Sequence, residues 1–300
     1  MIKKEFIDAV SGEFVKISAD EPMSLHTSFR IGGKADCFCE VRNIGALTDV
    51  VEACVRFGLP YFMIGQGSNL LVSDDGYRGV VIKLDGEFDE IERTGDNTIR
   101  CGAGATLAAA CVFARNNSLG GMEFAWGIPG SIGGAVYMNA GAYGGEIKDI
   151  VRSVRCLDGS TIKEISGREL AFSYRHSCFT DKQLVILDAE IELYPKNKNE
   201  IFFLMQDTME KRKKKQPLNR PSAGSVFKRP EGYYAAALIE QCGLKGVSVG
   251  DAQVSEKHSG FIVNNGKASA SQVKELINMV QSVVREKTGV ELQCEIKYIG

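Results

Sequence analysis

The chain of 300 residues lacks the features that mark membrane, secreted and nucleic-acid-binding proteins. No run of about eighteen apolar residues could span a bilayer, and the first residues hold no long apolar core typical of a secretory signal. The 36 lysines and arginines are matched by 38 aspartates and glutamates, so no excess of positive charge predicts a nucleic-acid partner. We therefore expect a cytoplasmic protein that binds neither membrane nor nucleic acid.

Patterns typical of metal sites and disulfide frameworks are also missing. The nine cysteines are an odd number without C-x-x-C spacing, and the three histidines stand far apart, at positions 26, 176 and 258. This spacing gives no zinc signature. Cysteines within apolar periodic segments, such as Cys54 and Cys111, are typical of reduced thiols in a core. We expect no metal ion and no disulfide framework.

The common nucleotide-binding motifs are absent or incomplete. No Walker A sequence occurs. An apolar strand expected at Tyr61–Ile64 leads into Gly65-Gln66-Gly67, but Leu70 occupies the place of the third glycine of the dinucleotide fingerprint. A turn at Asp74–Gly76 replaces the helix that should follow, and another strand is expected at Gly79–Leu84. These departures argue against a Rossmann domain.

What the chain does contain is a long glycine-rich segment, Gly127–Gly145, with seven glycines in nineteen positions. Glycine has no Cβ, so its main-chain N–H groups can closely approach an anion. Several such groups can form a concave nest for phosphate. A flexible surface loop is the alternative, but it would normally be polar, whereas Ile128, Ile132 and Val136 favour burial. The segment therefore predicts a phosphate-binding loop.

The remaining hydrophobic patterns indicate α+β layers divided into three parts. We expect helices over 46–57, 106–113, 201–215 and 269–288, and strands over 98–104, 151–157, 161–165, 184–193 and 290–299. Thr106 should cap the second helix, Ser269 and Gln272 should form a capping box for the last one, and Gly289 should end it. The polar stretch 195–199 is a candidate linker. We predict parts spanning 1–84, 85–195 and 196–300.

Three side chains outside the glycine segments are candidates for chemistry. Ser225 lies in a turn of small residues, Pro221–Lys228, and Arg175 stands between aromatic and hydroxyl residues, where it suits a bidentate contact to a carboxylate. Glu295 lies on the expected last strand. From the residues alone, a plain turn serine, an exposed loop arginine and a solvated strand glutamate remain alternatives.

Several blocks together resemble one family. They are Gly65–Asn69, Gly127–Ala135 with Met138–Gly144, Tyr174-Arg175, Pro221–Ser225 and Glu295, and their order and spacing extend over about residues 23 to 299. The family is that of the UDP-N-acetylenolpyruvoylglucosamine reductases of bacterial cell-wall synthesis. Because the interval between Arg175 and Pro195 is short, the chain resembles the subgroup that lacks an extra tyrosine-bearing loop.

The resemblance implies a flavoprotein with the FAD-binding fold of the vanillyl-alcohol oxidase type. Parts 1–84 and 85–195 would be the two α+β subdomains that bind FAD noncovalently, and 196–300 would be an α+β substrate-binding domain. Segment 29–33 would form an entry strand beside the cofactor. The residues implied at the cofactor are Arg30, Gly65, Gln66, Gly67, Ser68, Asn69, Leu70, Gly127, Ile128, Pro129, Gly130, Ser131, Gly133, Gly134, Ala135 and Asn139.

The resemblance also implies the reaction. NADPH would reduce FAD and leave, and the enolpyruvyl UDP-sugar would then occupy the same pocket of a monomeric enzyme. Arg175 and Glu295 match the residues that polarise the carboxylate of the substrate, and Ser225 matches the proton donor. Glu295 would have to act as a protonated or hydrogen-bonded acid, because a bare carboxylate would repel the developing charge. The residues implied at the substrate are Tyr174, Arg212, Lys215, Lys245 and His258.

Two other functions are compatible with the same residues. The first is a flavin oxidase or dehydrogenase of another small alcohol or lactone, a group that often attaches FAD through histidine. The second is a phosphate-binding regulator without catalysis.

Overall fold

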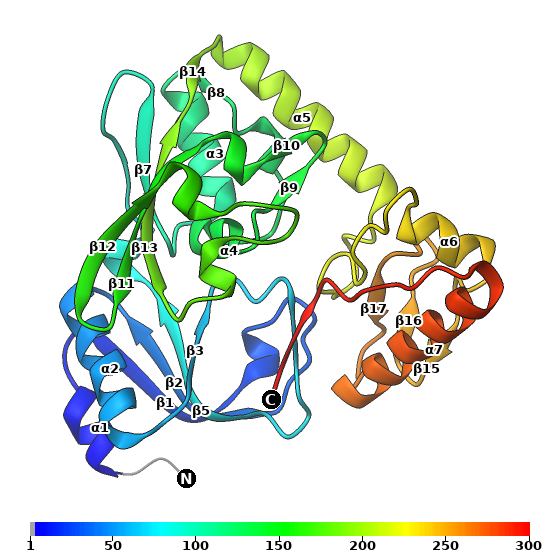
Figure 1. Cartoon of the computed structure of the whole chain (residues 1–300), viewed down its shortest axis with the longest axis horizontal. Helices are drawn as coiled ribbons and strands as arrows, with labels where there is room; N and C mark the ends of the chain where they lie inside the picture. Colours follow the sequence, from blue (N-terminus) through cyan, green and yellow to red (C-terminus); the bar gives the residue numbers. More distant parts are fainter. Residues whose placement is uncertain (1–3) are drawn as a thin grey trace. The chain divides into compact units, whose positions relative to one another are not determined.

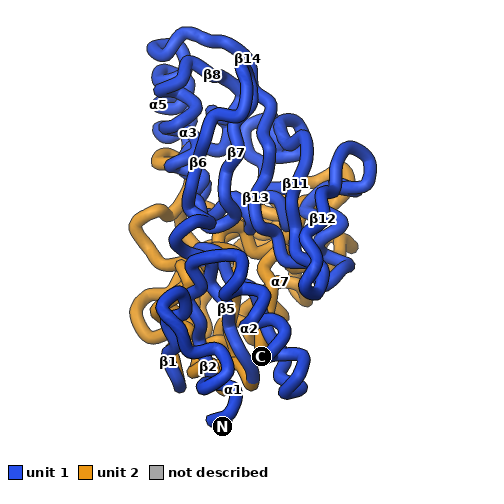
Figure 2. The backbone as a smooth tube through the Cα atoms, turned by 90° about the vertical axis from the view of Figure 1, so that its left-hand side faces the viewer, with its two compact units in different colours: residues 1–19, 37–66, 79–211 blue, residues 20–36, 67–78, 212–300 orange. Residues whose placement is uncertain are grey.

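The computed structural model describes residues 4–300 (Figure 1). By its contacts the chain forms two compact units, shown in different colours in Figure 2. Unit 1 holds residues 4–19, 37–66 and 79–211, and unit 2 holds residues 20–36, 67–78 and 212–300. The division into 1–84, 85–195 and 196–300 stays a prediction.

A four-stranded sheet begins the fold, with strand order β1-β2-β5-β3. Its strands are β1 (Val15–Pro22), β2 (Lys34–Val41), β3 (Tyr61–Ile64) and β5 (Tyr77–Leu84), and β3 pairs in parallel with β5. Helices α1 (Lys4–Val10) and α2 (Ile44–Phe57) pack against each other in unit 1. The Asn43 side chain caps α2, and Gly58 ends it in the left-handed conformation. The short strand β4 (Leu70–Val72) follows the first glycine bend where a Rossmann domain would have a helix.

A five-stranded sheet in unit 1 has strand order β12-β11-β13-β7-β6. Its strands are β6 (Ile91–Arg93), β7 (Thr98–Gly102), β11 (Val151–Asp158), β12 (Thr161–Ser166) and β13 (Val185–Glu192), which confirms four predicted strands. Helix α3 (Leu107–Asn116) begins after Thr106, whose hydroxyl accepts the N–H of Ala109 as predicted. Two short strands, β8 (Leu119–Gly120) and β14 (Tyr194–Pro195), pair with each other, so the predicted linker begins within a strand.

The glycine-rich segment is more ordered than a loop. It contains helix α4 (Ile132–Tyr137) and the hairpin strands β9 (Gly141–Ala142) and β10 (Gly145–Glu146). Helix α4 begins because the Ser131 hydroxyl accepts the N–H of Gly134. Short 3-10 helices connect many of the elements, namely η1 (Met23–Leu25), η2 (Gly86–Asp89), η3 (Glu123–Ala125), η4 (Ile147–Asp149), η5 (Gly167–Leu170) and η6 (Cys178–Thr180).

Helix α5 (Lys198–Lys215) carries the chain from unit 1 into unit 2. Unit 2 contains α6 (Ala235–Gln241), α7 (Ala270–Thr288) and a sheet of order β15-β16-β17. Its strands are β15 (Ser248–Val249), β16 (Ala252–Val254) and β17 (Ile262–Asn264), and α7 packs on this sheet (Figure 1). The predicted capping box of α7 is present, and Gly289 ends the helix with φ +73°. Each unit has its own hydrophobic core.

The predicted strand over 290–299 is wrong for most of its length. Only β18 (Lys297–Ile299) is a strand, and it pairs in parallel with β4. Residues 293–295 instead pair with 226–228, so the segment changes partner partway along. For this reason the apolar alternation does not make one buried face, and Cys294 and Tyr298 are exposed.

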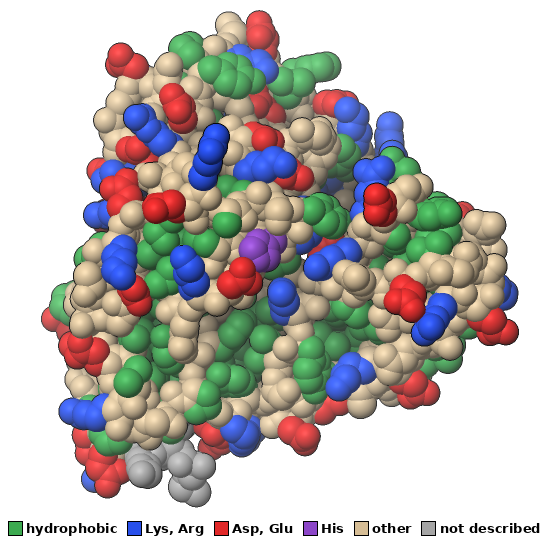
Figure 3. Space-filling view, in the orientation of Figure 1, with side chains coloured by type: hydrophobic (Ala, Val, Ile, Leu, Met, Phe, Trp, Pro, Cys, Tyr) green, Lys and Arg blue, Asp and Glu red, His purple; other side chains and the backbone are tan. Residues whose placement is uncertain are grey.

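The surface shows the balanced charge expected from the composition, and the cysteines are free thiols. Figure 3 shows basic and acidic side chains interspersed over the visible face. Eight cysteines are free and buried, as predicted, and the ninth, Cys294, is free and exposed. Within residues 4–300, no helix combines the length and apolar character needed to cross a membrane.

Candidate active site

The two predicted glycine bends meet in unit 1. A Cβ added to Gly65 would lie 2.4 Å from the Ser131 hydroxyl oxygen, so the absence of a side chain at Gly65 allows this contact. Ser131 itself is buried and caps α4. The two glycine bends therefore contact each other at these two residues.

Hydrogen bonds within the protein narrow which amides of the second bend can meet a ligand. The N–H of Ile132 donates to the carbonyl of Ala105 at 2.8 Å, and the N–H of Gly133 donates to the carbonyl of Ala103 at 2.9 Å. The N–H of Gly134 donates to the Ser131 hydroxyl. The N–H of Ile128 donates to the carbonyl of Ala125 at 3.0 Å, and Pro129 has no N–H. Amide contacts to a phosphate from this bend therefore fall to Gly127, Gly130 and Ser131.

A buried donor lies immediately before this bend. In the part of the chain that the structure describes, the indole Nε1 of Trp126 is buried and has no hydrogen-bond partner. An orphaned buried donor is costly, and a ligand acceptor would satisfy it. Together with the Gly65–Ser131 contact, this donor fits a bound dinucleotide such as FAD.

The first bend continues into unit 2 at Gly67. This residue has φ +59°, and a Cβ there would lie 2.0 Å from the carbonyl oxygen of His26. Ser28 donates its N–H to the carbonyl of Gly67 at 3.1 Å and its hydroxyl to the carbonyl of Ser222 at 2.7 Å. Ser28 therefore connects the glycine bend to the turn that carries Ser225, a link that no local sequence signal indicated.

Ser225 and Glu295 lie on neighbouring extended segments of unit 2. The N–H of Glu295 donates to the carbonyl of Val226 at 2.7 Å, next to Ser225 in the chain. The Ser225 hydroxyl donates to the carbonyl of Phe227 at 3.2 Å, and both Ser225 and Glu295 are half-buried. The structure thus brings two of the three predicted catalytic residues together on one small ladder.

Arg175, the third predicted catalytic residue, occupies a tight turn of unit 1. Ser173 and His176 exchange main-chain hydrogen bonds of 3.1 and 3.2 Å around Tyr174 and Arg175. Arg175 has φ +57°, lies over the Tyr174 ring at 5.0 Å and donates from Nη2 to the carbonyl of Gly141 at 3.3 Å. A positive φ is costly for a residue with a side chain, so the surrounding bonds must hold this turn.

Two residues predicted at the cofactor have unusual backbone conformations. Asn139 is fully buried with φ +43°, and its side-chain amide is bonded within the protein. Its contact with the cofactor stays a prediction. Arg30 is exposed with φ +55°. Residues 29–33 around it form an irregular loop before β2 and not the predicted strand. Phe29 anchors this loop in the core of unit 2.

Three of the predicted substrate residues influence one another in unit 2. Burial and the nearby charges of Lys245 and Lys215 lower the pKa of His258. Its Nδ1 accepts the N–H of Gly260 at 3.2 Å, which leaves Nε2 as the donor in the neutral ring. Lys245 also pairs with Glu240 at 2.6 Å. Two lysines and a neutral donor form a suitable site for a diphosphate.

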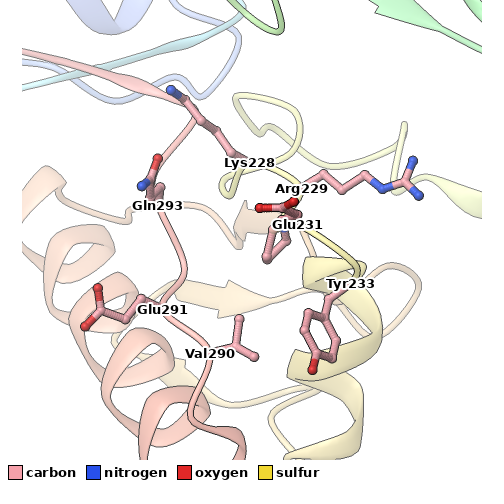
Figure 4. A pocket seen from close by; sticks show the side chains of 8 residues that line it. Lys228, Arg229, Glu231, Tyr233, Val290, Glu291 and Gln293 are labelled. Atoms are coloured by element: carbon pink, nitrogen blue, oxygen red, sulfur yellow. The ribbon is translucent and has the colours of Figure 1, made fainter.

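The other two predicted substrate residues lie on α5 and in the turn of Arg175. Arg212 is buried on α5, one helical turn before Lys215, whereas Tyr174 is 44% exposed beside Arg175 in unit 1. Unit 2 also has a pocket of about 320 Å³ lined by Lys228, Arg229, Pro230, Glu231, Tyr233, Val290, Glu291 and Gln293 (Figure 4). None of the predicted site residues lines this pocket.

Comparison with known proteins identifies the class. Residues 35–162 match the family described as FAD binding domain. A solved berberine bridge enzyme variant, 16% identical, shares the fold with a TM-score of 0.51 over 64% of this chain and 44% of that chain. The chain thus has an FAD-binding domain with the fold of the vanillyl-alcohol oxidase type.

The rest of the chain and its relatives identify the family. Residues 216–299 match the C-terminal domain of UDP-N-acetylenolpyruvoylglucosamine reductase. A protein of that name from Agathobacter rectalis is 48% identical over 100% of this chain and 99% of its own length. The crystal structure of the reductase (MurB) from Thermus caldophilus is 34% identical, with a TM-score of 0.82 over 95% of this chain and 99% of that chain. The chain belongs to the UDP-N-acetylenolpyruvoylglucosamine reductase family, flavoproteins of peptidoglycan precursor synthesis.

Proposed function

We propose that the chain reduces UDP-N-acetylglucosamine enolpyruvate to UDP-N-acetylmuramate with electrons from NADPH, as a cytoplasmic monomer of the subgroup without the tyrosine loop. The observation that carries the proposal is the pairing of the Ser225 and Glu295 segments through the 2.7 Å bond to Val226. Such pairing suits one group that donates a proton and a second that stabilises charge next to the same carbon atom.

The glycine bends are proposed to hold FAD noncovalently. Its diphosphate would meet main-chain amides of residues 65–69 and of Gly127, Gly130 and Ser131, where the glycines leave the backbone accessible. FAD, when bound, supplies a carrier that accepts hydride from NADPH and later delivers it to the methylene carbon of the substrate.

Arg175 and Glu295 are proposed to hold the charge that develops as the hydride arrives. The electron pair of the carbon–carbon double bond moves toward the substrate carboxylate, and the planar guanidinium of Arg175 can bind that carboxylate in a bidentate manner. Glu295 stabilises the same group as a protonated donor, since an ionised carboxylate would repel it. Donors fixed in advance are often the largest contribution to catalysis.

Ser225 is proposed to complete the reaction by protonating the carbon that bears the carboxylate. The new C–H bond takes the hydroxyl proton, and the serine then recovers a proton from solvent. Because a serine hydroxyl is a weak acid, it can act only on a strongly basic carbon. The cluster of Lys215, Lys245 and His258 is proposed to bind the diphosphate of the sugar nucleotide.

An anaerobic titration tests the proposal. Purified protein should be yellow, NADPH should bleach it, and UDP-N-acetylglucosamine enolpyruvate should restore the oxidised spectrum with one product formed per flavin. A colourless protein that takes up no flavin would support the regulator. Rapid bleaching that only oxygen reverses, with peroxide released, would support an oxidase.

A further inference from the structure

A polar network in unit 1 surrounds the turn that carries Arg175. At its centre is Asn139, which is fully buried. Its Nδ2 donates to the carbonyl of Ser173 at 2.9 Å and to Glu146 Oε2 at 3.1 Å, while its Oδ1 accepts the N–H of Lys148 at 2.9 Å. One amide thus ties the turn of Arg175 to the hairpin β9–β10.

The same hairpin approaches the guanidinium of Arg175 from a second direction. Arg175 Nη2 donates to the carbonyl of Gly141, and Gly141 is paired with Glu146 across the hairpin. A Cβ on Gly141 would lie 2.6 Å from Glu146 Cγ, so the glycine lets the glutamate stem lie against the strand. The carboxylate that holds Asn139 is therefore placed beside the carbonyl that holds Arg175.

Charge strengthens this arrangement. A hydrogen bond from Lys148, whose Nζ lies 2.7 Å from Oε2, is the largest influence that lowers the pKa of Glu146, with further contributions from Asn139 and from the charge of Arg175. Glu146 is thus ionised at neutral pH and attracts the guanidinium. Lys148, Asn139 and Arg175 share the Glu146 carboxylate. The carboxylate can therefore orient the Arg175 guanidinium without fully neutralising its charge.

We propose that Glu146 is a positioning residue, which acts with Asn139 to fix the direction and effective charge of Arg175 toward the substrate carboxylate. This inference rests on the role given to Arg175 under the proposed function. Glu146 itself touches neither substrate nor cofactor in the proposal. Its effect should therefore appear only in the step that uses Arg175.

The test is a double-mutant cycle followed by stopped-flow measurement of both half-reactions. Glu146→Gln keeps an acceptor for Asn139 and removes the charge. We expect flavin reduction by NADPH within twofold of wild type and enolpyruvyl reduction slower by about ten- to a hundred-fold, since small misplacements of a catalytic group cost this much. In Asn139→Gly, glycine can adopt the positive φ of this position, and the variant should also slow enolpyruvyl reduction. Lys163→Met, which removes an exposed lysine on β12 that pairs with Asp158 outside this network, is the control and should leave both half-reactions unchanged.

The cycle with Arg175→Gln separates the possible failures. If Glu146 acts through Arg175, the double variant should be no slower than Arg175→Gln alone. Additive losses would overturn the positioning role and leave the role of Arg175 intact. Equal losses in both half-reactions, or loss of bound flavin, would show that Glu146 is only structural. If Arg175→Gln alone leaves enolpyruvyl reduction unaffected, the proposed function of Arg175 fails.

Discussion

The Asn69 side chain donates its Nδ2–H to the main-chain carbonyl of Glu295 at 3.2 Å, across 226 positions of sequence. The N–H of Lys297 returns a bond to the carbonyl of Asn69 at 2.9 Å, where β18 begins beside β4. The last residue of the first glycine bend therefore fixes the backbone on which a predicted catalytic glutamate lies. A residue predicted for the cofactor and one predicted for catalysis are thus joined directly.

Replacement of Asn69 by alanine should affect one half-reaction more than the other. Loss of the bond should lower the free energy of unfolding by about 1 kcal/mol and let Glu295 shift, so enolpyruvyl reduction should slow more than flavin reduction. Gln281→Ala is a matched control, because Gln281 donates to the carbonyl of Leu292 on the same segment at 2.8 Å. It should cost similar stability and leave the ratio of the two rates unchanged. Equal ratios in both variants would contradict the link to Glu295.

Replacement of Ser225 by alanine should separate the half-reactions most clearly. Flavin reduction by NADPH should stay close to the wild-type rate, whereas enolpyruvyl reduction should slow by about 10²–10⁴, the usual contribution of a general acid. Stopped-flow absorbance of the flavin measures both rates. Ser222→Ala in the same turn is the control. The Ser28 hydroxyl donates to the main-chain carbonyl of Ser222, and alanine keeps that carbonyl. Equal loss in both half-reactions would refute the assignment of Ser225 as proton donor.

Local sequence signals predicted much of the secondary structure. The Thr106 cap and the Ser269–Gln272 box depend on residues three apart, so their bonds can be read from the chain. The segment 290–299 failed because its alternation could not reveal that the chain changes pairing partner between residues 295 and 297. Periodicity reports burial along a segment but does not report which strand lies beside it.

In the candidate site, too, local sequence patterns predicted some features, whereas contacts between residues far apart in the sequence could not be predicted. Glycine composition predicted both bends, because a close backbone approach requires residues without a Cβ. No local pattern could predict that Ser28 bonds Ser222, 194 positions away, or that Glu146 lies beside the Arg175 turn. Supporting residues of this kind are ordinary polar residues in the sequence, and only the folded backbone gives them their partners.

Two glycines with nearly equal φ, Gly67 and Gly159, allow the cost of a close packing contact at the first bend to be measured. Gly67 and Gly159 have φ +59° and +60°, but an added Cβ would collide with the carbonyl of His26 only at Gly67 and would meet nothing within 4 Å at Gly159. Gly159→Ala should cost about 1–2 kcal/mol of stability, the cost of a left-handed alanine. Gly67→Ala should cost about 3 kcal/mol or more and reduce bound flavin. Chemical denaturation and the ratio of flavin to protein absorbance provide the readouts, and similar values for both variants would contradict close packing at Gly67.

A pair of carboxyl groups at the end of β5 predicts a pH dependence of stability. Burial, followed by the hydrogen bond and charge of Asp85, raises the pKa of Asp89 to about 6, while the main-chain N–H of Gly86 is the largest influence that lowers the pKa of Asp85. Between about pH 4 and pH 6 the folded state holds a proton on Asp89 that the unfolded chain has released, so this carboxyl lowers stability as the pH rises through that window. Asp89→Asn should therefore match wild type near pH 3, below the ordinary pKa of 3.8, and exceed its free energy of unfolding at pH 7.5. The gain should be roughly 0.5–1 kcal/mol, because the side chain is exposed and water screens its charge.

Denaturation at both pH values measures the difference in free energy of unfolding between Asp89→Asn and wild type. Asp49→Asn on α2 is the control for the loss of one negative charge. A gain of equal size at both pH values would refute proton sharing between Asp85 and Asp89.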